Sequence, residues 1–343
     1  MAVVKQDKDS TAYFGGRIFF LGAGFSAAAG VPLTNVLLPK ALRLMRQEIP
    51  DFYERMCQYA RDIDLDLNGS PDATKFAHLC TYLDFLELRE HGGSERWSDR
   101  GSRERLCLNF FLAKAIAHST PEFTEIPELY RKFVDRIRYP DIVVTFNWDT
   151  LLENAFDAAG VPFSYDFQRG TVWLIKLHGS VNWVFGRHDP LTNTPDDLGF
   201  EKILGDFNTE GLDIFSIPKL RMRSSWESLK PLIHGIDPLI VLPGYGKSFD
   251  VRKLSDLWYK IEHVSVQQGP IFIIGLRVSD DDFIMEGLFR YLFRAAFKST
   301  RVVSVMNPDA EVGTRFRAIA GEHLSMRFLE AKFCADTIDG LLA

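Results

Sequence analysis

The chain has 343 residues, of which 46% are hydrophobic and 25% are charged, and its formal net charge is −6 at pH 7. These values are typical of a folded protein that contains one large domain or two ordinary ones, and they exclude wholesale disorder. The negative charge gives no basis for a general nucleic-acid-binding surface.

The first ten residues and the cysteines favour a reduced, cytoplasmic protein. The segment MAVVKQDKDS has no long apolar stretch, so we expect neither a secretory signal nor a membrane anchor. No apolar run approaches the roughly 20 residues that a membrane span needs. The four cysteines contain no Cys-x-x-Cys pair, which argues against a structural zinc site and a disulfide framework; they are Cys57, Cys80, Cys107 and Cys334.

Apolar runs of β type recur along the chain, and helical patterns lie between them. Most of the runs are nearly continuous rather than alternating, as in strands that are covered on both faces of a parallel sheet. Helical patterns are clearest at 149–159 and 283–297, and another begins near Asn35. This succession predicts an α/β fold with a Rossmann-like, doubly wound parallel sheet. The apolar runs cover residues 18–21, 142–146, 173–177, 239–242, 271–274 and 302–306.

Two stretches interrupt this succession. Between residues 40 and 140, amphipathic patterns at 76–88 and 104–117 are separated by turn-rich and polar segments, which predicts a helical insertion after the first strand. Residues 186–237 are rich in Pro, Asn, Asp and Gly, and they predict an irregular surface excursion that can approach a site. We expect one domain over residues 14–343 that contains both stretches.

The first apolar run ends in a Gly-x-Gly turn, Gly22-Ala23-Gly24, which leads through Ser26 into small, helix-compatible residues. Such a turn directs backbone N–H groups and the positive end of a helix dipole toward a ligand, which suits a pyrophosphate. Gly22 permits the tight turn, and Gly24 permits the backbone to approach an anion closely. The alternative is a purely structural turn, and two later segments bear on this choice.

Polar side chains follow two other apolar runs. Thr145, Asn147 and Asp149 come at the carboxyl end of a predicted strand, where ligands bind in open α/β sheets. Asn147 can donate and accept hydrogen bonds, whereas Asp149 either accepts them from a ligand or caps the helix that follows. His178 ends another run, and histidine is the side chain best suited to proton transfer near neutral pH.

Together these segments resemble the motifs of the sirtuin superfamily. Residues 22–26, Gly-Ala-Gly-Phe-Ser, are similar to its Gly-Ala-Gly-x-Ser loop, and residues 145–149, Thr-Phe-Asn-Trp-Asp, to its Thr-Gln-Asn-x-Asp motif. His178-Gly179 matches its catalytic His-Gly pair. Gly275 and Asn307 fall in weaker matches to its adenosine-side motifs. The three strong motifs follow the family order at compatible spacing.

The chain also departs from the sirtuin deacetylases. They carry a four-cysteine zinc module after the catalytic histidine, but the first cysteine after His178 is Cys334. Phe146 replaces the family's Gln, and Leu33-Thr34 replaces the Asp-Phe-Arg that follows its Gly-Ile-Pro. These departures favour a divergent bacterial branch that lacks the zinc module and resembles NAD-consuming antiphage defence effectors.

The resemblance implies an NAD⁺ hydrolase that cleaves the nicotinamide–ribose bond to give nicotinamide and ADP-ribose, with NAD⁺ as substrate and no metal. It implies that Asn147 orients the ribose and an attacking water, that Asp149 faces the nicotinamide amide, and that His178 accepts hydrogen bonds or protons. The residues that it implies for NAD⁺ binding are Gly22, Ala23, Gly24, Ser26, Thr145, Gly275 and Asn307.

Other functions stay open at this point. The chain is alternatively a protein deacylase or ADP-ribosyltransferase, or a non-catalytic scaffold subunit that senses NAD or ADP-ribose. The helical insertion offers a surface for self-association, so we expect a homo-oligomer. The resemblance also implies a separate ATPase or nucleic-acid-sensing partner protein, and no membrane.

Overall fold

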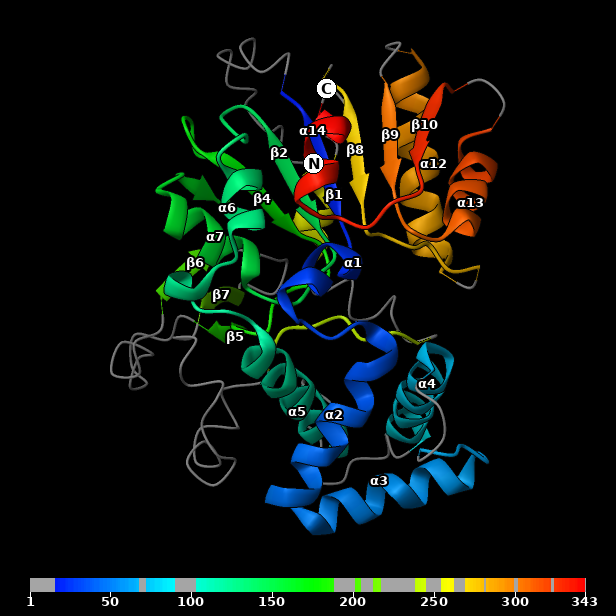
Figure 1. The fold of residues 1–343 in the computed structure, drawn as a ribbon. Coiled ribbons are helices and arrows are strands. Elements are labelled where there is room, and N and C mark those ends of the chain that lie inside the picture. The colour runs from blue at the N-terminus through cyan, green and yellow to red at the C-terminus, as the bar shows by residue number, and fades with distance from the viewer. Residues whose placement is uncertain are drawn as a thin grey trace, which may run out of the picture.

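A seven-stranded sheet forms the centre of the molecule, with helices on both of its faces (Figure 1). A further group of helices lies beyond the carboxyl ends of the strands. The sheet is parallel, which confirms the predicted doubly wound, Rossmann-like α/β fold. The computed structural model describes residues 16–67, 72–89, 103–187, 201–204, 212–216, 238–244, 254–261, 269–280, 282–298, 302–321 and 324–342.

The strands of this sheet are short, and most of them are fully buried. Four consecutive buried residues in each of β1, β2, β8 and β9 explain the continuous apolar runs, because both faces of these strands are covered. The order across the sheet is β10-β9-β8-β1-β2-β4-β3. In chain order the strands are β1 (Ile18–Leu21), β2 (Ile142–Thr145), β3 (Phe163–Ser164), β4 (Val172–Lys176), β8 (Ile271–Ile274), β9 (Val303–Met306) and β10 (Met326–Leu329).

The order of strands reverses between β1 and β8. The chain first builds outward from β1 through β2 to β4, and then returns to the other side of β1 to add β8, β9 and β10. Leu21, the last residue of β1, therefore lies opposite Thr145 on one side and Ile274 on the other. In doubly wound sheets this reversal creates a crevice outside the carboxyl ends of the strands, and ligands bind there.

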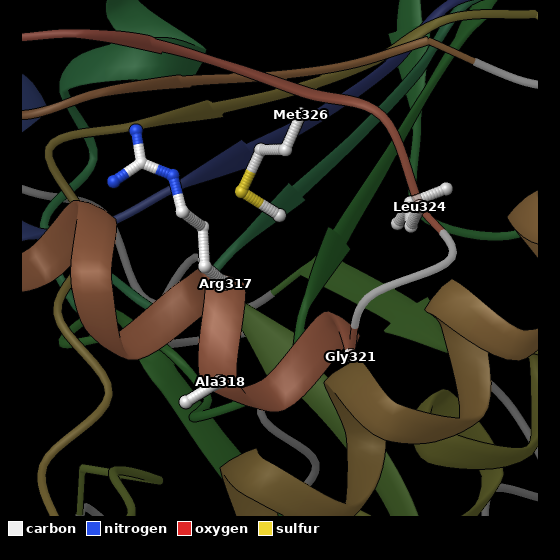
Figure 2. A pocket seen from close by; sticks show the side chains of 5 residues that line it. All are labelled: Arg317, Ala318, Gly321, Leu324 and Met326. Carbon is white, nitrogen blue, oxygen red and sulfur yellow. The ribbon is translucent and has the colours of Figure 1, made fainter.

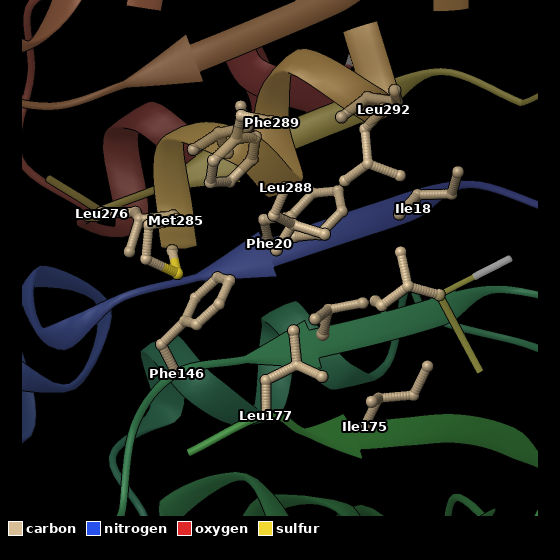
Figure 3. Close-up of a cluster of buried hydrophobic side chains, with 14 of the residues drawn as sticks. Ile18, Phe20, Phe146, Ile175, Leu177, Leu276, Met285, Leu288, Phe289 and Leu292 are labelled. Carbon is tan, nitrogen blue, oxygen red and sulfur yellow. The ribbon is translucent and has the colours of Figure 1, made fainter. Parts of the chain in front are cut away.

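Two layers of helices cover the sheet. Helices α10 (Ser255–Tyr259), α12 (Phe283–Lys298) and α13 (Ala310–Ala320) pack on the face that carries Ile18 and Phe20 (Figure 3). The opposite face is covered by α1 (Ala23–Ser26), α6 (Glu128–Val134), α7 (Leu151–Ala159) and α14 (Ala335–Leu342). Alternate residues of β1 thus enter two different cores, as the geometry of a strand requires.

Four helices form a separate group, which we call the helical unit: α2 (Thr34–Glu48), α3 (Pro50–Asp62), α4 (Ala73–Arg89) and α5 (Arg103–Ser119). It has its own core and lies beyond the carboxyl ends of the strands (Figure 1). The unit starts at Thr34 rather than at residue 40, and α6, which the sequence analysis placed in the insertion, packs on the sheet. Within the part of the chain that the structure describes, no helix has the length and apolar character that a membrane crossing requires.

The apolar run at 239–242, which we name the seam segment, was expected to be a strand of the sheet, and this prediction is wrong. It forms only an isolated antiparallel bridge between Ile240 and Gly179. Leu239 and Val241 are buried in the sheet core, whereas Ile240 and Leu242 are buried in the core of the helical unit. The run is apolar on both faces because it lies between two cores. A segment between two cores and a buried strand of a parallel sheet have the same apolar composition, so the sequence does not distinguish them.

The sequence predicted that the stretch at 186–237 is irregular, but parts of it form regular structure. Its described parts contribute to an antiparallel three-stranded sheet in the order β5-β7-β6. The remainder of the stretch lies outside the described residues. The strands are β5 (Trp183–Arg187), β6 (Glu201–Leu204) and β7 (Leu212–Ser216).

The bridge to the seam segment makes Gly179 sensitive to substitution. Its φ is +75°, and a Cβ there would lie 1.9 Å from the carbonyl oxygen of Leu239. The left-handed conformation alone costs a residue with a Cβ roughly 1–2 kcal/mol, and the overlap adds to this cost. We expect Gly179→Ala to lower the free energy of unfolding by more than about 2 kcal/mol, measured by urea denaturation followed by circular dichroism.

Gly287→Ala in α12 is the matched control. A Cβ at Gly287 meets nothing within 4 Å, and alanine favours a helix over glycine by roughly 0.5–1 kcal/mol. Equal urea midpoints for the two variants would contradict the proposed constraint at Gly179.

Candidate active site

The predicted site residues gather at the carboxyl edge of the parallel sheet, because each follows or ends a strand. This edge faces the helical unit (Figure 1). Thr145 and Lys176 lie opposite each other on β2 and β4, so Asn147 and His178 both stand two residues beyond a paired position on neighbouring strands. The residues at this edge are Gly22, Ala23, Gly24 and Ser26 after β1, Thr145, Asn147 and Asp149 at the end of β2, His178 after β4, Gly275 after β8 and Asn307 after β9.

The loops after β1 and β8 pack backbone against backbone. The N–H of Gly22 donates to Ile274 O (3.0 Å), and the N–H of Gly24 donates to Gly275 O (2.8 Å). A Cβ would lie 2.5 Å from Leu276 Cα at Gly22 and 2.9 Å from Gly275 Cα at Gly24. We expected these two N–H groups to face a pyrophosphate, but they are donors within the chain. Contact between the two loops is sufficient to explain both glycines.

Asn147 joins the loop after β2 to the loop after β1. Its Nδ2 donates to Gly22 O (2.9 Å) and to Ser26 Oγ (3.0 Å), and its backbone N–H donates to Thr145 Oγ1 (3.1 Å). The hydroxyl of the buried Ser26 is also near enough to the carboxyl group of Asp149 to act on its pKa. The side-chain nitrogen of Asn147 is thus used within the chain, and its Oδ1 is the atom that can accept from a water or a hydroxyl.

Asp149 is buried, and the buried ammonium group of Lys176 lies beside it. Its Oδ1 accepts from the N–H of Leu151 (3.0 Å), the first residue of α7, so the carboxyl group satisfies a main-chain donor of the first turn from the position before the N-cap residue, Thr150. Lys176 is fully buried, and its Nζ donates to the carbonyl oxygen of Asp149 (2.6 Å) and to Glu153 Oε1 (2.8 Å). The hydroxyl of Tyr165 also donates to Glu153 Oε1 (3.1 Å).

Burial is the main influence on the acid–base behaviour of this cluster. It raises the pKa of Asp149 above the ordinary value, while the charge of Lys176 and the hydrogen bonds from Leu151 and Ser26 act in the opposite direction. Burial also raises the pKa of Tyr165 well above its ordinary value, and the neighbouring Glu153 adds to this rise. The carboxyl group of Asp149 therefore holds its proton to a higher pH than an exposed aspartate does.

His178 is half-buried, and within the described part of the chain its ring contacts those of Phe146 and Trp258. The ring of Phe146 lies 5.2 Å away between centroids, and that of Trp258, from α10, lies 6.5 Å away. The carbonyl oxygen of His178 accepts from the N–H of Val241 in the seam segment (2.9 Å). Sequence reasoning missed Trp258, because no motif or spacing signals that a tryptophan in a short helix contacts a residue 80 positions earlier.

Asn307 connects the loops after β8 and β9. It is buried, its Nδ2 donates to Leu276 O (3.3 Å), and its Oδ1 accepts from the N–H of Asp309 (3.0 Å). Its side chain therefore holds the two loops together, while Gly275 lies against the loop after β1.

A hollow between α13 and β10 lies away from this edge (Figure 2). It is at the end of α13 and the beginning of β10, so it is at the amino end of the strands, and it contains none of the predicted site residues. Its lining residues are Arg317, Ala318, Gly321, Leu324 and Met326.

The fold and this edge define a doubly wound, Rossmann-like α/β protein with polar side chains gathered where its strands end. The chain matches no protein-family model and no curated protein sequence. Its function is therefore inferred from its own residues.

The buried Lys176–Glu153 ion pair predicts that removing Lys176 greatly lowers the free energy of unfolding. Lys176→Met leaves the Glu153 carboxylate buried beside no ammonium group, and breaking a buried pair in this way costs about 3–5 kcal/mol. Urea denaturation measures the loss. Arg290→Met, which breaks the more exposed Arg290–Glu286 pair, is the control and should cost much less, because solvent screens that pair. Equal losses in the two variants would contradict this assignment.

The raised pKa of Asp149 predicts that the stability of the folded chain depends on pH. Because its pKa is raised in the folded chain, the folded chain holds this proton more tightly than the unfolded chain does. The free energy of unfolding then falls as pH rises from the ordinary pKa toward the raised one, by at most about 1.4 kcal/mol per pH unit for one proton. Asp149→Asn lacks this titration.

We expect the wild-type free energy of unfolding minus that of Asp149→Asn to decrease as the pH rises above the ordinary pKa of an aspartate. Denaturation of both proteins at a series of pH values above that pKa tests the sign. A difference that is constant or increases with pH would show that the pKa of Asp149 is not raised.

Proposed function

We propose that the chain is an NAD⁺ hydrolase that cleaves the nicotinamide–ribose bond and releases nicotinamide and ADP-ribose. The observation that carries the proposal is the pair of hydrogen bonds from Asn147 Nδ2 to Gly22 O and Ser26 Oγ, which joins two of the three sirtuin-like motifs. This junction is beside the strand reversal between β1 and β8, the place where doubly wound sheets bind dinucleotides.

The reaction needs a group that accepts a proton near the ribose. The C–N bond breaks with its electron pair on the nicotinamide nitrogen, and the anomeric carbon develops oxocarbenium character. A water oxygen then bonds to that carbon and gives up one proton. We assign this proton to His178, and we assign the orientation of the water or a ribose hydroxyl to Asn147 Oδ1. Such positioning lowers the barrier without a covalent intermediate.

The contacts revise the roles of the remaining predicted residues. Gly22 and Gly24 shape the loop, since their N–H groups bond within the chain. We retain Ser26 and its neighbour Ala23 as contacts of the pyrophosphate side. In this proposal Gly275 and Asn307 shape the adenosine side, Thr145 Oγ1 and Ser26 Oγ hold Asn147 in place, and Asp149 lies near Ser26.

We extend the proposal to the biological role that the motif resemblance implies. The hydrolase would deplete cytoplasmic NAD⁺ as an antiphage defence effector, as a homo-oligomer or with an ATPase or nucleic-acid-sensing partner protein. The helical unit, which contacts the seam segment beside His178, is the part of the chain that such a partner would engage. Phage plating and cellular NAD⁺ measurement, with and without His178→Ala, test this role.

Nicotinamide release from NAD⁺, measured by chromatography, tests the activity. Removing a positioned proton-transfer group costs about 10²–10⁴-fold in rate, and removing a directed polar contact costs about 10²–10³-fold, so we expect His178→Ala and Asn147→Ala each to lose at least about a hundredfold. His78→Ala, at an exposed histidine on α4, is the matched control and should retain wild-type turnover.

Three other outcomes would contradict the proposal. Unaltered turnover in both site variants would exclude the assigned roles. Tight NAD⁺ binding without nicotinamide release, alone or with the products of adjacent genes, would indicate a sensing scaffold. Nicotinamide release that requires an acyl-lysine peptide, or that transfers ADP-ribose to protein, would indicate a deacylase or transferase.

A further inference from the structure

The ring of His178 is in contact with aromatic side chains from two separate elements. Phe146 directly follows β2, and its ring plane is inclined by 65° to that of His178 at 5.2 Å. Trp258 belongs to α10, and its ring plane is inclined by only 30° at 6.5 Å. Both separations fall in the range of interacting aromatic pairs. The orientation of the imidazole is therefore determined in part by ring packing.

Trp258 contacts the main chain at the same place. Its Nε1–H donates to the carbonyl oxygen of Leu177 (3.0 Å), the residue before His178. Leu177 is fully buried, and its own N–H donates to Thr145 O (3.1 Å). One side chain thus touches both the imidazole ring and the backbone from which that ring projects. An indole N–H that is removed from water normally finds such an acceptor.

The position of Trp258 is itself held by the sheet core. Leu254 precedes α10, Leu257 lies within it and Ile261 follows it, and all three are buried in that core. The N–H of Trp258 donates to Leu254 O (3.2 Å). Because α10 is anchored on both sides of Trp258, the indole is presented to the end of β4 in one orientation.

We propose that Trp258 is a positioning residue that sets the orientation of the His178 ring. Without the indole, the imidazole loses one of the two ring contacts that the described residues provide, and the carbonyl group of Leu177 loses the indole donor. Catalytic groups need reacting atoms within a narrow range of positions, so a small rotation of the ring reduces the rate more than it reduces substrate binding. The effect on rate rests on the proposed NAD⁺ hydrolysis, whereas the effect on the ring does not.

The orientation of the ring is tested on the free protein by NMR. Histidine labelled with ¹³C at Cε1 gives one signal per residue, and the signal that is absent in His178→Gln is that of His178. Trp258→Leu removes the ring current of the indole, so the His178 signal shifts even if the ring does not turn. A turn of the ring is reported by the nuclear Overhauser effects between the His178 and Phe146 rings, and we expect these to change. Tyr259→Leu is the matched control, because Tyr259 is the next residue of α10 and is 67% exposed. It should leave the His178 signal in place.

Nicotinamide release tests the consequence for the reaction. We expect Trp258→Leu to lower kcat by about tenfold to a hundredfold, with KM changed by less than about threefold. Trp258→Phe restores an aromatic ring but no N–H donor, and it should recover part of kcat. Tyr259→Leu should match the wild type. A residue that only stabilised α10 would produce no such recovery and no split between kcat and KM.

Two results would overturn this role. The first is unchanged Overhauser effects between His178 and Phe146 in folded Trp258→Leu. The second is a change in these effects with an unchanged kcat. If the wild type releases no nicotinamide, the proposed function fails, while the NMR comparison still decides whether Trp258 orients the ring. If Trp258→Leu does not fold, Trp258→Phe carries both measurements, because it removes the indole N–H and one ring.

Discussion

The candidate site depends on the close approach of the loops after β1 and β8 at the point where the sheet changes direction. The N–H of Gly24 donates to Gly275 O at 2.8 Å, and a side chain at either position would separate the two backbones. This contact places Ser26 in the first turn after β1, where its hydroxyl meets Asn147 Nδ2. The glycine-rich turn therefore has a structural reason to exist before any ligand is considered, and it brings the polar side chains of two strand ends together.

A buried charge supports the other side of the same site. Lys176 Nζ donates to the carbonyl oxygen of Asp149 and to the carboxylate of Glu153. Because Lys176 is the last residue of β4, these bonds attach the turn after β2 to β4. Burying these groups is costly, and the bonds from Lys176 and Tyr165 offset that cost at Glu153 Oε1, whereas the buried Glu153 Oε2 has no hydrogen-bond partner among the described residues. Asn147 is two residues before Asp149, so the side chain that we assign to orienting the water lies on the same turn that Lys176 holds.

The seam segment contributes side chains both to the core of the helical unit and to the core of the sheet. In the seam segment, alternate residues enter the sheet core and the helical core, and Val241 N–H bonds the carbonyl oxygen of His178. His178 is therefore bordered by the seam segment through its backbone and by Phe146 and Trp258 through its ring. The proposed proton acceptor is held by elements from well-separated parts of the sequence.

The sequence by itself determined the α/β class, most of the buried strands and the polar residues that stand at their ends. It could do so because apolar composition reports burial, and because turn and polar residues mark where a strand stops. Only the tertiary structure decided that residues 239–242 lie between two cores, that the N–H groups of Gly22 and Gly24 bond within the chain, and that Asp149 faces inward. It also decided that Trp258 touches His178. The physical reason is common to all four: a pattern records that a group is buried or polar, but its partner is chosen by contacts between segments far apart in the chain.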